Sequence, residues 1–285
     1  GLCLSGNTMT TAFFIHIPKT AGTSFRKAAE AYFSSDRIVY DYGKQSAETS
    51  EVTHRWLYEP GHEDRWGFYR ALDLLDVALV GGHVGANRFV DGFGAGRSVT
   101  FLREPLQRMA SEYQHFCRHY GYEDSFRAFF SRPVMRNRMH KMMQGVPLEA
   151  LGVVGLTERY AESLDIVNRC FGWQLEARED NRAHEHIGVP HQVDADDADF
   201  FYRHNNADVQ LYELGRQLFE TRLDLMQRGQ HYVHGKVNAA HPNRVAGWAW
   251  WAGERNDPVT IEVLVNDQLA KTVSAVELRP NLLRL

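Results

Sequence analysis

A lysine and a group of hydroxyl side chains follow an apolar run near the start of the chain. Residues 13–17 (FFIHI) predict a buried strand, and Pro18, which cannot donate a hydrogen bond to a sheet, ends it. A helix-forming stretch follows at residues 25–33. A strand, a short loop and a helix N-terminus together present backbone N–H groups and the positive end of the helix dipole to an anion. We therefore expect the loop to bind a phosphate group. The residues expected to contact it are Lys19, Thr20, Ala21, Gly22, Thr23 and Ser24.

An arginine and a serine form a second candidate anion site. Arg103 directly follows the apolar run 98–102, and Pro105 suits the first position of a helix. An apolar stripe at spacings of 3, 4 and 3 predicts that this helix runs to about residue 119, with Ser111 about two turns inside it. Because arginine offers a planar fork that matches phosphate oxygens, and serine adds a hydroxyl donor, the pair predicts a second phosphate contact.

A histidine follows another apolar run. Residues 76–80 predict a strand that Gly81 and Gly82 end, and His83 comes next. Ligands of open α/β sheets bind beyond the carboxyl ends of the strands, which is where His83 is expected to lie. The ordinary pKa of histidine suits a general base near neutrality. We therefore expect His83 to be the catalytic base.

Three segments resemble the sulfotransferases that use 3′-phosphoadenosine-5′-phosphosulfate (PAPS), the family of the heparan sulfate 2-O-sulfotransferases and their bacterial relatives. Residues 16–25 (HIPKTAGTSF) resemble the 5′-phosphosulfate loop, residues 82–84 (GHV) the segment of the catalytic histidine, and residues 102–113 (LREPxxRxxSxY) the 3′-phosphate segment. Residues 154–164 (VGLTERYxESL) are also common in this family. Residue 140 is a histidine where relatives carry a threonine, so no role is transferred to it.

The resemblance implies a sulfotransferase that moves a sulfuryl group from PAPS to an acceptor hydroxyl, with a glycan as the expected acceptor, without a metal. The loop at 19–24, Lys19 included, would hold the 5′-phosphosulfate, and Arg103 and Ser111 the 3′-phosphate. His83 would deprotonate the acceptor, and Lys19 would stabilise charge on the leaving phosphate. Two alternatives stay open. One is an ATP-dependent P-loop kinase, and the other is a non-catalytic glycan-binding protein with a relic nucleotide fold. The kinase is disfavoured because Lys19 precedes the glycine, unlike the order G-x-x-x-x-G-K-[ST].

The alternation of strands and helices predicts an α/β fold with a P-loop-like parallel sheet flanked by helices. From about residue 233 the pattern changes to β. Strands are expected at 244–251, 260–265 and 269–273. We expect a sulfotransferase domain at 9–230 and a small all-β module at 233–285 that is truncated at its end. Its tryptophans, Trp248, Trp250 and Trp251, would form the core of a small sandwich or contact sugar.

Composition limits the other function classes. The 285 residues carry a net charge of −4, which gives no reason to expect nucleic-acid binding. The three cysteines lack CxxC spacing, which argues against a disulfide scaffold or a cysteine zinc site. No apolar run reaches the ~18 residues of a membrane span, and the N-terminus lacks the pattern of a signal peptide. We expect a cytoplasmic protein with Met9 as its natural start, while its oligomeric state stays open. A metal site at His184-x-His186 with Asp180, and a phosphate contact from Arg182, are weaker alternatives.

Overall fold

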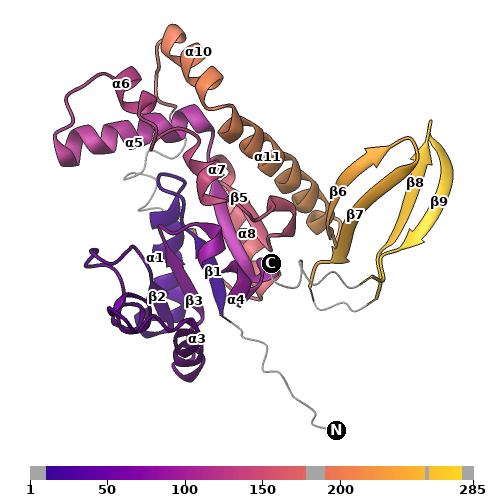
Figure 1. The fold of residues 1–285 in the computed structure, drawn as a ribbon, viewed down its shortest axis with the longest axis horizontal. Coiled ribbons are helices and arrows are strands. Elements are labelled where there is room, and N and C mark those ends of the chain that lie inside the picture. The colour runs from indigo at the N-terminus through magenta and orange to yellow at the C-terminus, as the bar shows by residue number, and fades with distance from the viewer. Residues whose placement is uncertain (1–10, 178–189, 254–256, 278–285) are drawn as a thin grey trace.

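The computed structural model describes residues 11–177, 190–253 and 257–277, and it has a five-stranded parallel sheet at its centre (Figure 1). The strand order is β2-β3-β1-β4-β5, and every neighbouring pair is parallel. The strands are β1 (Ala12–Ile15), β2 (Ile38–Tyr40), β3 (Leu79–Gly82), β4 (Ser98–Leu102) and β5 (Val153–Leu156). Nearly all of their residues are buried, as expected when helices cover both faces of a parallel sheet.

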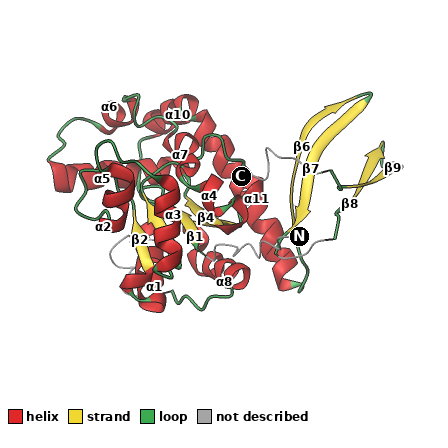
Figure 2. Ribbon diagram, turned by 60° about the horizontal axis from the view of Figure 1, so that its bottom comes forward, coloured by secondary structure: helices red, strands yellow, loops and turns green. Residues whose placement is uncertain are grey.

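Helices surround the sheet, as Figure 2 shows. They are α1 (Gly22–Phe33), α2 (Glu51–Thr53), α3 (Arg65–Leu74), α4 (Val90–Phe93), α5 (Pro105–Tyr120), α6 (Phe126–Ser131), α7 (Arg138–Met142), α8 (Tyr160–Phe171), α10 (Ala195–His204) and α11 (Asn206–Gln227). The prediction of a parallel sheet flanked by helices is confirmed. None of the helices in the described ranges is long and apolar enough to cross a membrane.

Two boundaries differ from the sequence predictions in ways that affect the site. Helix α1 begins at Gly22 rather than at Phe25, so its first turn forms part of the loop. Strand β3 includes Gly81 and Gly82, and His83 follows the strand directly. A Cβ atom on Gly82 would lie 1.8 Å from the backbone oxygen of Asp41, so the close approach of the two chains there requires glycine.

Helix α5 begins with a well-formed cap and carries the apolar stripe that its sequence predicts. The Glu104 side chain accepts hydrogen bonds from the backbone N–H groups of Leu106 and Gln107, and Pro105 occupies the first turn. The stripe packs into a second apolar cluster that α5 shares with α6 and α10. This packing fixes the rotation of α5 about its axis, and therefore the direction of the face that carries Ser111.

The C-terminal residues form two separate antiparallel hairpins rather than one small sandwich. The first pairs β6 (Val233–His241) with β7 (Arg244–Trp251), and the second pairs β8 (Thr260–Val265) with β9 (Gln268–Ser274). The rings of Trp248 and Trp250 stack 4.6 Å apart and pack against the core of the α/β sheet. The expectation that these two tryptophans form the core of a sandwich is therefore wrong, because the main domain covers them.

A buried arginine ties the first hairpin to the α/β region. Arg222 of α11 is 3% exposed and donates hydrogen bonds to the backbone oxygens of Leu151 (3.0 Å) and Glu149 (3.2 Å). Its guanidinium also lies 3.3 Å from Nδ1 of His234 on β6. Burial, followed by the charge of Arg222, lowers the pKa of His234 to about 4. The histidine therefore stays neutral beside the arginine at neutral pH.

Candidate functional site

The loop between β1 and α1 has the backbone shape of an anion cradle. Lys19 and Ala21 adopt left-handed backbone conformations, with φ of 67° and 65°. The N-cap residue of α1, Ala21, makes no side-chain capping hydrogen bond, and the positive end of the helix faces the loop. The buried Thr20 hydroxyl donates to the backbone oxygen of Ile17 at 2.8 Å, so this side chain shapes the loop. Any contact of Thr20 with a ligand would come from its backbone.

His83 reaches the cradle because β3 is a neighbour of β1 in the sheet. Its ring centroid lies 4.3 Å from that of His16 and 4.8 Å from that of Tyr42. The His83 side chain is exposed at the surface, although the protein around the ring desolvates part of the imidazole. This desolvation and then the charge of Arg138 lower the pKa of His83 to about 4. The imidazole is therefore neutral at physiological pH and can accept a proton.

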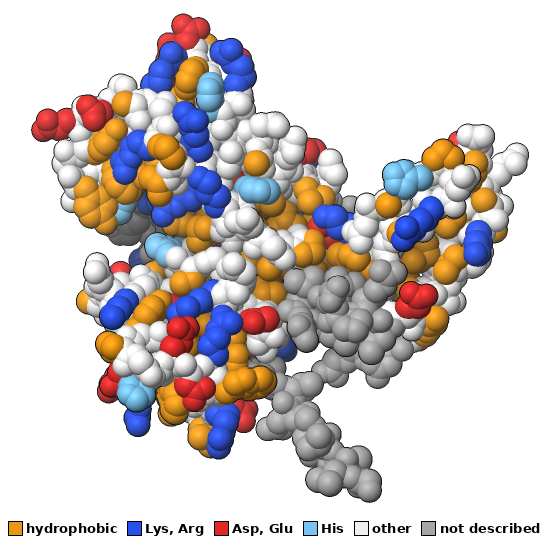
Figure 3. All heavy atoms as spheres, in the orientation of Figure 1, with side chains coloured by type: hydrophobic (Ala, Val, Ile, Leu, Met, Phe, Trp, Pro, Cys, Tyr) orange, Lys and Arg blue, Asp and Glu red, His pale blue; other side chains and the backbone are white. Residues whose placement is uncertain are grey.

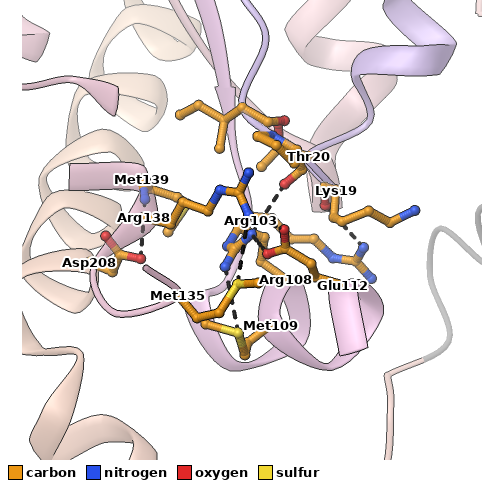
Figure 4. A network of polar contacts seen from close by, with 12 residues as sticks. Lys19, Thr20, Arg103, Arg108, Met109, Glu112, Met135, Arg138, Met139 and Asp208 are labelled. Atoms are coloured by element: carbon orange, nitrogen blue, oxygen red, sulfur yellow. Dashed lines mark hydrogen bonds and ion pairs between the residues drawn. The ribbon is translucent and has the colours of Figure 1, made fainter. Parts of the chain in front are cut away.

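Arg103 reaches the cradle from the opposite side, because β4 is the other neighbour of β1. The residue is 7% exposed, and its Nη1 atom donates to the backbone oxygen of Lys19 at 3.3 Å (Figure 4). One arm of the guanidinium thus supports the loop. The structure brings together Lys19, Arg103 and His83, which the sequence had named separately.

Ser111 is half-buried on α5, one turn before His115. Burial, followed by the positive charge of Lys19, lowers the pKa of His115. The charge of Lys19 therefore acts on the part of α5 that carries Ser111.

A buried ion network, which the sequence had not predicted, supports the cradle from below (Figure 4). Arg108 is fully buried and donates both to the backbone oxygen of Pro18 (3.4 Å) and to Glu112. Glu112 in turn accepts a hydrogen bond from Arg138 at the start of α7. Asp208 of α11 accepts hydrogen bonds from the backbone N–H groups of Met139 and His140, both on α7. The network therefore joins the loop, α5, α7 and α11. The spacing R-x-x-x-E in a helix was the available sequence signal.

His16 is a second residue without a predicted contact, although it begins the segment that resembles the 5′-phosphosulfate loop. Its ring is 6% exposed, stacks on Phe14, and lies against both Tyr42 and His83. Residues 13–17 read as a continuous buried strand, and nothing in that pattern separates His16 from the core. Only its position beyond the last residue of β1 brings it to the edge where the strands end.

The surface around these residues is hollowed. Figure 3 shows an indentation between the part of the molecule that carries α5, α6 and α10 and the part that carries α1 to α3, with Lys and Arg side chains gathered along its upper side. The alternatives that involve Asp180, Arg182, His184 and His186 lie outside the described residues. Within the described ranges, no group of three or more His, Cys, Asp or Glu side chains is arranged to hold a metal ion.

Comparisons with known proteins give little further information. No family model matches the sequence, and no curated protein matches it. Among solved structures, the crystal structure of a sulfotransferase from Alicyclobacillus acidocaldarius is 20% identical, with 70% of this chain and 93% of that chain covered and a TM-score of 0.41. A TM-score this low carries no argument, so any assignment of function rests on the site described above.

Proposed function

We propose that this protein is a PAPS-dependent O-sulfotransferase whose acceptor is a hydroxyl group, with a glycan as the first candidate. One observation carries the proposal. Three neighbouring strands, β3, β1 and β4, end at one edge of the sheet and bring a neutral histidine, a lysine loop at a helix N-terminus and a buried arginine together there. A base, a cradle for a reacting anion and a second cation are the groups that sulfuryl transfer between two oxygens requires.

The 5′-phosphosulfate would lie in the loop, held by Lys19 and by the backbone N–H groups of Ala21 to Ser24. Arg103 and Ser111 would contact the 3′-phosphate. This assignment agrees with the sequence order, in which Lys19 precedes the glycine. The proposed domain organisation assigns the reaction to residues 9–230 and residues 233–285 to a small all-β module whose first hairpin packs against that domain.

In the reaction, the acceptor oxygen attacks sulfur while the bond from sulfur to the 5′-phosphate oxygen breaks. His83 takes the proton of the acceptor hydroxyl, and Lys19 stabilises the negative charge that grows on the leaving phosphate. The products are a sulfate ester and adenosine 3′,5′-bisphosphate. The low pKa of His83 in the free protein keeps its lone pair available. The negative charge of a bound cofactor would raise that pKa toward the range in which a general base is most effective.

The experiment is sulfuryl transfer from labelled PAPS to a panel of glycans, tyrosine peptides and small alcohols. His83→Ala is expected to slow transfer by about 10²- to 10⁴-fold, the usual contribution of a general base. The matched control is His62→Ala, because His62 is exposed. Unchanged transfer by His83→Ala would show that the base is another group. Transfer of phosphoryl from ATP with magnesium, in place of sulfuryl from PAPS, would overturn the proposal.

A further inference from the structure

One buried polar group at the cradle has no role in the reaction described above. His16 is 6% exposed, and its Nδ1 atom lies 3.1 Å from the hydroxyl oxygen of Tyr42. Its other nitrogen, Nε2, lies against Gly22, the first residue of α1, because a Cβ atom built on Gly22 would be only 1.8 Å from it. A nearly buried imidazole is therefore directed at the N-terminus of the helix that forms the cradle.

The hydrogen bond to Tyr42 indicates which nitrogen of His16 carries the proton. Burial raises the pKa of Tyr42, so its hydroxyl keeps its proton at neutral pH. The neighbouring Arg26 guanidinium lies near Tyr42, with its central carbon 5.7 Å from the centroid of the ring. Because a guanidinium has donors and no acceptor, it does not compete for the Tyr42 O–H, which is available to Nδ1 of His16. Nδ1 then accepts, and Nε2 bears the N–H group that faces the cradle.

The surroundings also keep this imidazole uncharged. Burial is the main cause of a pKa of His16 well below its usual value, and the positive charges of Arg26 and Lys19 act in the same direction. A neutral imidazole at a helix N-terminus can donate a hydrogen bond to an anion without carrying a charge of its own. It therefore adds a directed donor to the charge that Lys19 supplies.

We propose that His16 donates a hydrogen bond from Nε2 to an oxygen of the 5′-terminal anion in the cradle, and so fixes that group beside His83. The inference rests on the proposed function, since it names a further contact of the same cofactor. Gly22 is part of the same arrangement, because only a residue without a side chain leaves room for the ring. The contact makes His16 a specificity residue for the 5′ group, whereas Arg103 and Ser111 act on the 3′ group.

The test compares two ligands by calorimetry, adenosine 3′,5′-bisphosphate and adenosine 3′-monophosphate, which lacks the 5′-phosphate. His16→Phe keeps a ring that can stack on Phe14 but removes the donor. It is expected to weaken binding of the bisphosphate by about 10- to 100-fold, the range for a lost hydrogen bond to a charged group. Binding of the monophosphate is expected to change less than twofold. His16→Gln, whose amide can place an N–H group near the position of Nε2, is expected to retain affinity for the bisphosphate within about threefold.

Three outcomes would overturn the role of His16. These are unchanged binding of the bisphosphate by His16→Phe, an equal loss for both ligands, and a loss in His16→Gln as large as in His16→Phe. Ser111→Ala serves as the control with the opposite pattern, because it is expected to weaken binding of both ligands. Nitrogen-15 NMR of the wild-type protein gives an independent readout, since a proton on Nδ1 in place of Nε2 contradicts the inference. If the wild-type protein bound neither nucleotide, the proposed function itself would be refuted. The proposed contact of His16 would then be refuted together with it.

Discussion

The packing of His16 against α1 gives the sharpest prediction about the architecture of the cradle. In Gly22→Ala, the new Cβ atom would lie 1.8 Å from Nε2 and 2.0 Å from Cδ2 of His16, far inside any real contact distance. The ring has little room to retreat, because it stacks on Phe14 at 5.1 Å and contacts Tyr42 and His83. The substitution must therefore displace a buried imidazole or the first turn of α1.

The magnitude follows from two opposing effects. Alanine is a better helix former than glycine by up to about 1 kcal/mol, although less at the first position of a helix. Overpacking of a buried site costs about 1–3 kcal/mol. We expect the overpacking to exceed the gain, so that the free energy of unfolding of Gly22→Ala falls by about 1–2 kcal/mol, the difference between these two effects.

Urea unfolding measures the change, and two further variants make it specific. Gly96→Ala is the matched control, since a Cβ atom there meets nothing within 4 Å, and its free energy of unfolding is expected to change by less than about 0.5 kcal/mol. Adding His16→Ala to Gly22→Ala removes the ring that the new methyl group meets. The two substitutions are therefore expected to be non-additive by more than about 0.5 kcal/mol. A Gly22→Ala protein as stable as the wild type, or strict additivity of the pair, would refute the packing described here.

Three other predictions concern the ionisable groups. The His83 pKa of about 4 predicts that the NMR signals of its ring do not titrate near pH 6.5. It also predicts that kcat/KM falls only as the pH drops through about 4, where the imidazole becomes protonated. Titration of His83 near pH 6.5 in the free protein would contradict both predictions. Adenosine 3′,5′-bisphosphate should raise that pKa, because it adds negative charge beside the ring. Lys19→Met is expected to weaken binding of this nucleotide at least tenfold in calorimetry, whereas Lys27→Met, at an exposed position on α1, should leave it unchanged; equal effects would exclude a specific role of Lys19. Arg222→Leu leaves two buried carbonyl groups without their donor and should lower the free energy of unfolding, measured in urea, by about 2–4 kcal/mol. The surface variant Arg228→Leu should lower it by less than about 0.5 kcal/mol. Equal stability of the two variants would argue against the docking of the first hairpin by Arg222.

The fold could be predicted from the sequence because its signals are local. Each signal predicts the structure of the segment in which it lies. The signals are the apolar runs at 98–102 and 153–156 and the proline after residue 104. The positions of β4, β5 and α5 follow from them. The same holds for the hairpin turn, where Asn266 and Asp267 adopt positive φ angles of 50° and 62° between β8 and β9.

The site was only partly predictable, because its assembly depends on the order of the strands. The sequence could not reveal that β3 and β4 both lie beside β1, and this arrangement is what brings His83 and Arg103 to the loop. His16 was missed for the same reason, since a histidine in an apolar run cannot be told from a core residue without its neighbours. The stacking of Trp250 on the main domain also depends on tertiary packing, in this case against a surface far away in the chain.

Nucleotide binding by the wild-type protein tests the central claim most directly. The protein should be titrated calorimetrically with adenosine 3′,5′-bisphosphate in the presence of EDTA, and separately with ATP and magnesium. The proposed function predicts tight binding of the bisphosphate without a metal and much weaker binding of ATP. Preference for ATP with magnesium would favour a kinase, and failure to bind either nucleotide would favour a protein that has lost its nucleotide site. Either result would contradict the account.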